Sequence, residues 1–295
     1  MPGVGQNLQD HYMVPFQWET DKGFADIPIP ALFNPRANQD FLNAAVIFDR
    51  DTTMMKHTSF FNLSSQEQHW LSRANELNLE ILAVNNWHPG VSPPATPKLF
   101  LGAVGLVPQS EGSVSLTSSD WHDAPSIQSN LLGDEHGLDL AFAISYTCRV
   151  LNLIEYTDAV SPHIVSPELR PKSDSEEDIT ASLGENVATL WHPARTTRMG
   201  PLDDESDRMV DPFFRVRRFE NLRIADPGVV PVMPNCHPAS VALLIGAWAS
   251  ERIITLKLEK GKQYYLQGSS FLCVHGFQDR SPNMVAGMTG QIELA

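Results

Sequence analysis

The segment Trp191-His-Pro-Ala-Arg-Thr-Thr-Arg-Met-Gly200 has neither the period of a helix nor that of a strand, so it is predicted to be a loop. Functional side chains concentrate on loops at element boundaries, and His192 lies in this one. A second loop, Pro231 to Ser240, contains His237 and leads into the last periodic segment. An imidazole accepts a proton at neutral pH, and two imidazoles can share one substrate hydroxyl. From residue pattern alone, however, a single loop histidine is more often structural than catalytic.

Length and composition narrow the class of protein. The chain has 295 residues, 42% of them hydrophobic and 19% charged, and a formal net charge of −14. At roughly 100–200 residues per domain, this length predicts one large globular domain or two small ones. The acidic balance argues against a nucleic-acid partner, because few cations are available to replace phosphate counterions. Cys148, Cys236 and Cys273 show no C-x-x-C spacing, so neither a disulfide scaffold nor a metal site is expected.

Targeting signals are absent from the pattern of this chain. No run of about 18 apolar residues is present, so we expect no transmembrane segment. The start, Met1-Pro-Gly-Val-Gly-Gln, lacks the basic and apolar regions of a signal peptide. Localisation and oligomeric state stay open.

Strand and helix patterns are mixed along the chain. Apolar runs predict strands at 13–18, 79–84, 98–108, 111–118 and 221–226, the last short and buried. Helical spacing predicts helices at 66–78 and 134–154 and a well-buried helix from Pro238 to about residue 254. Another helix begins within 173–179, where a capping serine precedes acidic residues that favour the positive end of the helix dipole. From Lys257 onward the periodicity fades.

Four ordered motifs resemble those of the glucose–methanol–choline (GMC) family of flavin oxidoreductases. They are Val4-Gly-Gln-Asn-Leu-Gln-Asp-His11, His192-Pro-Ala-Arg-Thr-Thr-Arg-Met-Gly200, Asn221-Leu-Arg-Ile-Ala-Asp226 and the loop that contains His237. The segment Glu111–Asp120 and the following Ala124–Asn130 resemble a strand and turn of the family's substrate domain. The likeness runs from about Gly3 to about Ile254 and is closest in motif to the aryl-alcohol oxidase and glucose oxidase branches.

The resemblance implies an α+β fold. Its antiparallel-sheet substrate domain would be backed by helices, and a C-terminal strand and helix would belong to a Rossmann-like FAD domain whose main part is absent. The implied boundaries are 1–12 for a lead-in from the FAD domain, 13–205 for the substrate domain, 206–258 for the C-terminal part of the FAD domain and 259–295 for a tail.

The resemblance also implies FAD as cofactor and a small-molecule alcohol as substrate. The alcohol would be oxidised to a carbonyl by hydride transfer to the flavin, with His192 as base and His237 as the second catalytic histidine. The residues that the likeness places against the cofactor are Asp226, Pro227, Gly228, His237 and Pro238. We further expect a structural hydrogen bond at His11, and substrate contacts are considered for His88 and Trp191.

Several departures from the family pattern leave an alternative open. No strand–G-x-G-x-x-G–helix unit is present, because Leu8 stands in place of the third glycine after Gly3 and Gly5. The chain is therefore expected to be the C-terminal half of a family member. Arg195 occupies a position where the motif has glycine, and Pro227-Gly228 replaces the usual Ala/Gly-Ser. The alternative is a non-catalytic GMC-like fragment that binds no FAD.

A third class of protein is poorly supported. A histidine-based metal or hydrolytic enzyme would be expected to carry an H-E-x-x-H or G-x-S-x-G motif, and this chain has neither.

Overall fold

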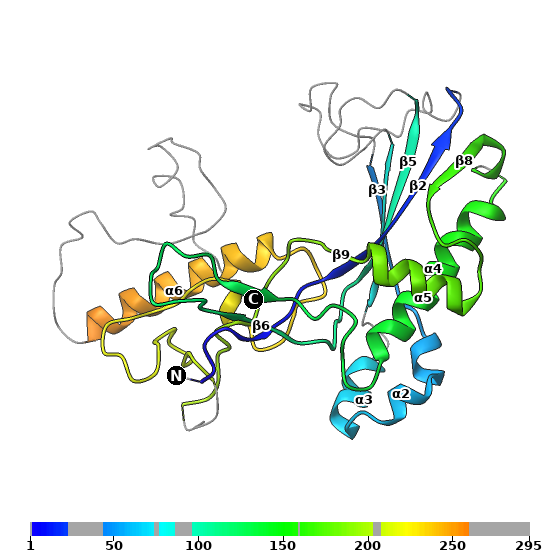
Figure 1. Cartoon of the computed structure of the whole chain (residues 1–295). Helices are drawn as coiled ribbons and strands as arrows, with labels where there is room; N and C mark the ends of the chain where they lie inside the picture. Colours follow the sequence, from blue (N-terminus) through cyan, green and yellow to red (C-terminus); the bar gives the residue numbers. More distant parts are fainter. Residues whose placement is uncertain are drawn as a thin grey trace, which may run out of the picture.

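The structure is a computed structural model that describes residues 2–22, 44–73, 77–85, 96–158, 160–202 and 208–259. These residues form two lobes, and the beginning of β2 and the short strand β9 lie between them (Figure 1). Residues 86–95, which include His88, and the region after residue 259 lie outside the described residues.

The larger lobe is an antiparallel sheet in the order β3-β4-β5-β2-β8, with β9 paired to the start of β2. Its strands are β2 (Tyr12–Thr20), β3 (Ala44–Asp49), β4 (Leu79–Asn85), β5 (Lys98–Gly105), β8 (Ile164–Leu169) and β9 (Ala188–Thr189). Pro15 lies in β2 between the residues that pair with β9 and those that pair with β8. A proline is tolerated there because that edge of the strand is locally unpaired.

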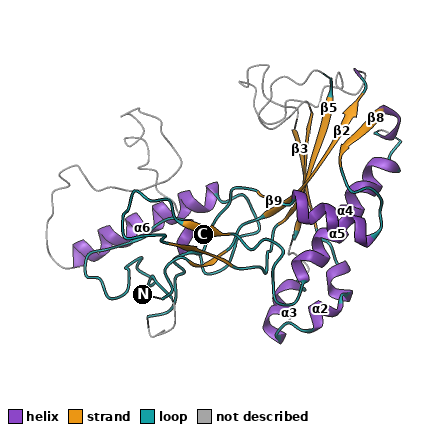
Figure 2. Ribbon diagram, viewed as in Figure 1, coloured by secondary structure: helices purple, strands orange, loops and turns teal. Residues whose placement is uncertain are grey.

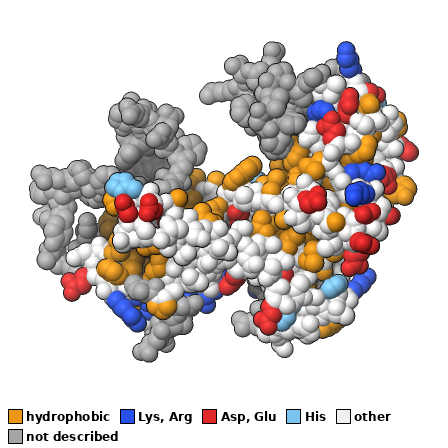
Figure 3. All heavy atoms as spheres, viewed as in Figure 1, with side chains coloured by type: hydrophobic (Ala, Val, Ile, Leu, Met, Phe, Trp, Pro, Cys, Tyr) orange, Lys and Arg blue, Asp and Glu red, His pale blue; other side chains and the backbone are white. Residues whose placement is uncertain are grey.

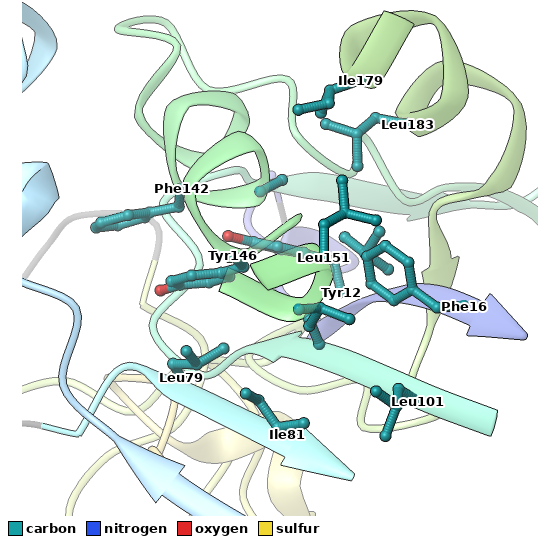
Figure 4. Close-up of a cluster of buried hydrophobic side chains, with 14 of the residues drawn as sticks. Tyr12, Phe16, Leu79, Ile81, Leu101, Phe142, Tyr146, Leu151, Ile179 and Leu183 are labelled. Carbon is teal, nitrogen blue, oxygen red and sulfur yellow. The ribbon is translucent and has the colours of Figure 1, made fainter. Parts of the chain in front are cut away.

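Helices cover one face of this sheet (Figure 2). They are α4 (Leu138–Glu155) and α5 (Glu176–Asn186). The short helices α2 (Thr58–Phe61) and α3 (Ser65–Leu71) lie at the lower end of this lobe in the same view, and 3-10 helices are present at Thr53–Lys56 and Ser161–His163. The buried residues of α4 follow one another at helical spacing, so one face of the helix packs on β2, β4 and β5. Phe142 and Tyr146 stack with ring centroids 5.6 Å apart in this core (Figure 4). The predicted α+β fold, with an antiparallel sheet backed by helices, is confirmed.

Helix α5 begins as its sequence predicts. The Ser175 side chain accepts a hydrogen bond from the backbone N–H of Asp178, and the first turn contains Glu176, Glu177 and Asp178. The acidic run is therefore a helix N-terminus. The helix predicted over 66–78 is shorter than expected, because α3 ends at Leu71.

The smaller lobe combines a three-stranded antiparallel sheet with the last helix. The sheet has the order β1-β6-β7, formed by β1 (Gln6–Leu8), β6 (Gly112–Ser115) and β7 (Ser126–Gln128), and the helix is α6 (Ala239–Glu259). Gly5 precedes β1 with φ of 75°, and a Cβ there would collide with the Val114 carbonyl. The first glycine-rich segment thus serves a close approach between two backbones.

Two predictions for this lobe are wrong. Residues 221–226 are exposed or half-buried and form only an isolated bridge between Arg215 and Arg223, instead of a buried strand. Helix α6 is present, but it is not well buried, since Leu243 is 74% and Leu244 67% exposed. Only part of α6 is buried, and its buried residues include Ile245 and Ala249. Figure 3 shows hydrophobic side chains at the surface of both lobes.

None of the helices in the described ranges has the length and apolar character needed to cross a membrane.

The contact between β2 and β5 yields the first prediction. A Cβ on Gly105 would overlap the ring of Tyr12, whereas a Cβ on Gly184 of α5 would meet nothing within 4 Å. We expect Gly105→Ala to lower the free energy of unfolding by about 1–3 kcal/mol through overpacking. The control Gly184→Ala should raise it by about 0.5–1 kcal/mol, because alanine favours a helix. Urea denaturation measures both, and equal stabilities of the two variants would contradict the close packing.

Candidate functional site

A backbone ladder brings two motifs together that are far apart in the sequence. Tyr12 and Met13 of β2 pair with β9, and Gln9 pairs with Ala194 through two backbone hydrogen bonds. Between these pairs, residues 190–193 lie opposite only residues 10 and 11. The two extra residues make the segment 190–193 bulge outward. Trp191 in the bulge has φ of 60°. As a result, His11 and His192 lie side by side.

Three imidazoles form a cluster at this bulge. Nδ1 of His11 lies 3.0 Å from Nδ1 of His192, and Nε2 of His11 lies 3.0 Å from the carbonyl oxygen of Pro234. The rings of His192 and His237 meet edge to face with centroids 4.8 Å apart. The structure therefore places both predicted catalytic histidines in contact, and it adds His11 as a third member.

Glu80 completes the cluster from the large sheet. It lies on β4 and is fully buried, and its carboxylate accepts a hydrogen bond from Nε2 of His237 at 2.9 Å. An uncompensated buried carboxylate would be costly, and this hydrogen bond provides a partner. Glu80 is not among the residues predicted for this site, although a charged residue within the apolar run 79–84 indicates a buried polar contact.

Burial keeps two of the imidazoles neutral. Desolvation lowers the pKa of His11 to about 4, and repulsion from His192 and His237 adds to this effect, whereas the nearby carbonyls of Pro234 and Leu106 oppose it. Desolvation likewise lowers the pKa of His192 to about 4, with a smaller contribution from His237. Each of these rings therefore has one N–H and one lone pair at neutral pH.

Asp10 orients the loop that carries His192. Its carboxylate accepts hydrogen bonds from the backbone N–H of His192, at 2.9 Å, and from the Thr189 hydroxyl. Burial raises the pKa of Asp10, and these hydrogen bonds act in the opposite direction. Asp10 thus fixes the backbone of His192, and His11 contacts its ring.

A cavity of about 770 Å³ opens beside the cluster. His192, Trp191, Asp10 and Asp226 line it, together with small and apolar residues of β6, β7 and the start of α6. Four of the five residues predicted to contact a cofactor line this cavity, namely Asp226, Pro227, Gly228 and Pro238. The fifth, His237, contacts His192. Trp191 is 70% exposed.

The cavity wall around Gly228 is built from paired loops. Thr197 N–H donates to the Gly228 carbonyl at 3.0 Å, and Met199 N–H donates to the Val229 carbonyl at 2.9 Å. Asp226 caps the 3-10 helix Pro227–Val229 by accepting from Gly228 N–H at 2.7 Å. A Cβ on Gly228 would lie 2.7 Å from Asp226 Oδ1, so this glycine permits the close approach.

Arg195 adopts the left-handed backbone conformation, with φ of 72°. This is the region that favours glycine, which is the residue expected at this position from the motif. Its guanidinium is largely buried and forms an ion pair with Glu111 at 3.0 Å. Burial lowers the pKa of Arg195, and Glu111 is the main opposing influence.

Within the part of the chain that the structure describes, no group of three or more His, Cys, Asp or Glu residues is arranged to hold a metal ion.

Comparison with known proteins finds similarity to one family of enzymes. Residues 108–246 match the family model of the GMC oxidoreductases. An uncharacterized GMC-type oxidoreductase of Mycobacterium tuberculosis is 34% identical over 164 residues, 55% of this chain and 30% of that protein. Oxygen-dependent choline dehydrogenase 1 of Chromohalobacter salexigens is 26% identical over 258 residues, 86% of this chain and 44% of that protein.

The fold is similar to that of a solved enzyme structure. A structure of Aspergillus oryzae formate oxidase, which concerns the modification of its FAD, matches with a TM-score of 0.69 at 22% identity. The match covers 89% of this chain and 48% of formate oxidase. Such relatives are FAD-binding flavoproteins, and this chain spans less than half the length of each of the three.

The conformation of Arg195 can be tested with two substitutions. Arg195→Ala and Arg195→Gly both remove the guanidinium and its contact with Glu111, and they differ only in the backbone cost at positive φ. We expect the glycine variant to be more stable than the alanine variant by about 1 kcal/mol. Urea denaturation compares them, and an alanine variant of equal or greater stability would contradict the left-handed conformation.

The buried histidines predict a pH dependence of stability. Between pH ~6.5 and about 4 the unfolded chain binds protons at His11 and His192 that the folded chain excludes, so stability falls as the pH falls through this window. Replacing His11 by Asn should reduce this loss by up to about 3 kcal/mol, the equivalent of its pKa shift. The control is His69→Asn, which removes an exposed histidine instead of a buried one. Denaturation between pH 4 and 7 measures the slope, and an unchanged slope in His11→Asn would contradict the prediction.

Proposed function

We propose that this chain is the substrate-domain part of an FAD-dependent enzyme that oxidises a small alcohol to a carbonyl. The observation that carries the proposal is the contact between His192 and His237 at the edge of a cavity lined by Asp226, Pro227 and Gly228. The match of residues 108–246 to the family model of the GMC oxidoreductases supports the same reaction class.

The cavity has the chemistry to accept a flavin ring. Its volume of about 770 Å³ lies within the range of ~300–1,000 Å³ that is common for ligand sites. Gly228 has no side chain, so the backbone at Pro227 and Gly228 can lie close to a flat ring in the cavity. The first turn of α6 lines the cavity at Pro238 and Ala239, so the positive end of a long helix faces a bound group. When bound, FAD would supply the hydride acceptor for the alcohol carbon.

His192 is suited to remove the hydroxyl proton. Its pKa of about 4 keeps the ring neutral at physiological pH, so a lone pair is available as the hydride leaves the alcohol carbon. Asp10 fixes the backbone of this residue, which reduces the motion needed to bring the base to the hydroxyl. The proton then resides on His192, and the substrate becomes a carbonyl compound.

His237 is suited to hold the substrate oxygen. Glu80 accepts from Nε2 of His237, which fixes the ring and leaves Nδ1 for another partner. If the ring carries a second proton, Nδ1 becomes a donor to the oxygen and Glu80 balances the charge. The two histidines would then divide the work, with one accepting the proton and the other orienting the oxygen.

The proposal includes a second part of the enzyme that this chain does not contain. The exposed apolar residues of α6 and the segment 221–226 would complete a Rossmann-like FAD domain, in which residues 206–258 form the C-terminal part. Burial of Leu243 and Leu244 against such a sheet would remove apolar surface from water.

The alternative is a non-catalytic GMC-like module that binds no FAD. Arg195 favours it, because a charged side chain replaces glycine three residues from the proposed base. The guanidinium pairs with Glu111, however, and Arg195 is not among the residues that line the cavity beside His192. We therefore place the catalytic proposal first.

A fusion protein tests the proposal. The part of the Mycobacterium tuberculosis GMC-type relative that precedes the matched region would be joined to this chain, and the absorbance spectrum would report bound flavin. We expect the fusion to retain flavin and to bleach on anaerobic addition of primary alcohols. His192→Ala should retain the flavin but lose about 10²–10⁴-fold in the rate of bleaching, and the distant control His122→Ala should not.

The outcomes separate the two functions. Flavin retained but bleached at the same rate in His192→Ala would contradict the assignment of the base. A folded fusion without bound flavin would contradict the cofactor site and support the non-catalytic alternative.

A further inference from the structure

We propose that His11 is a positioning residue that fixes His192 in the tautomer with its proton on Nδ1 and its lone pair on Nε2. The role of that lone pair as the base rests on the proposed function above, whereas the tautomer itself is a property of this chain. His11 is fully buried in the segment that continues into β2. It touches the loops of both predicted catalytic histidines.

The carbonyl of Pro234 determines which nitrogen of His11 carries the proton. Its carbonyl oxygen can only accept, and it lies 3.0 Å from Nε2 of His11. Nε2 of His11 must therefore carry the N–H, because a lone pair there would face the oxygen lone pairs. Pro234 belongs to the loop that leads to His237, so the starting point is fixed by backbone.

The proton on Nε2 of His11 in turn determines the tautomer of His192. A neutral imidazole has one N–H, and that of His11 is used at Nε2, so its Nδ1 is an acceptor. Nδ1 of His192 lies 3.0 Å from this acceptor and must be the donor. His192 then keeps its lone pair on Nε2, so between the rings of His11 and His192 this is the nitrogen left to take a proton. The neutral state of both rings follows from their burial.

The opposite arrangement carries a clear penalty. If His192 had its proton on Nε2, two lone pairs would face each other at Nδ1, or His11 would have to reverse and give up Pro234. Either change leaves a buried acceptor or donor unsatisfied. His11 thus transmits the polarity of a backbone carbonyl to the proposed base, and a residue that merely filled space could not do so.

Heteronuclear NMR of the chain labelled with ¹⁵N-histidine tests the tautomer directly. Two-bond ¹⁵N–¹H correlations at pH 7 distinguish a protonated ring nitrogen from a bare one, and the His192→Gln variant assigns the His192 signals. We expect protonated Nδ1 and bare Nε2 for His192, and the reverse for His11. A His192 ring with its proton on Nε2 in the native chain would overturn the proposal.

Substitutions test whether His11 is the cause. His11→Leu removes the acceptor, and we expect the His192 signals to shift toward the Nε2–H form or a mixture. His11→Asn offers an amide oxygen near the former Nδ1, and it should restore the native tautomer. An unchanged His192 tautomer in a folded His11→Leu chain would overturn the proposal, and the native measurement stands even if that variant fails to fold.

The fusion enzyme separates this inference from the proposed function. There, His11→Leu should lower kcat about 10²-fold with little change in KM, and His11→Asn should recover most of it. If the native tautomer is as proposed but no variant of the fusion oxidises alcohols, the function fails and the tautomer stands. If the fusion is active and His11→Leu changes KM but leaves kcat unchanged, the positioning role fails.

Discussion

The antiparallel pairing of residues 9–13 with residues 188–194 is the constraint on which the rest of the structure depends. It joins His11 and His192, which are 181 positions apart in the chain. One of its segments continues into the interior strand β2, and the other continues into the loop 195–199 that pairs with 227–229. A slip of one residue would turn His11 to the opposite face and break the histidine contact. The large sheet therefore sets the geometry of a site at the boundary of the two lobes.

Buried polar groups convert this backbone register into chemistry. His11 and Glu80 are fully buried, and each has a specific partner in Pro234 and His237. A buried group without a partner would destabilise the fold, so these contacts restrict the rings to few orientations. The same burial lowers the pKa of His11 and His192 and leaves both neutral. Folding thus determines both where the imidazoles lie and which of their nitrogens can accept a proton.

The sequence predicted best what local patterns control. Apolar spacing alone identified β2, β4, β5 and α4, and a capping serine with acidic neighbours identified α5. The segment 221–226 failed because an apolar run does not tell whether a partner strand is present. The structural hydrogen bond predicted for His11 is present, but its partners, and the role of Glu80, could not be predicted because they depend on contacts between distant segments. The choice of His192 and His237 came from family motifs, because a loop histidine carries little signal by itself.

Arg195 shows how far long-range pairing can override a local rule. The left-handed backbone at this position disfavours any residue with a Cβ, at a cost of about 1 kcal/mol. The neighbouring bonds from Ala194 to Gln9 and from Thr197 to Gly228 hold the loop from both sides, so the chain accepts this strain. The guanidinium gains an ion pair with Glu111 in return. Since the backbone path near His192 follows from these pairings, arginine in place of glycine changes the surroundings of the loop more than its conformation.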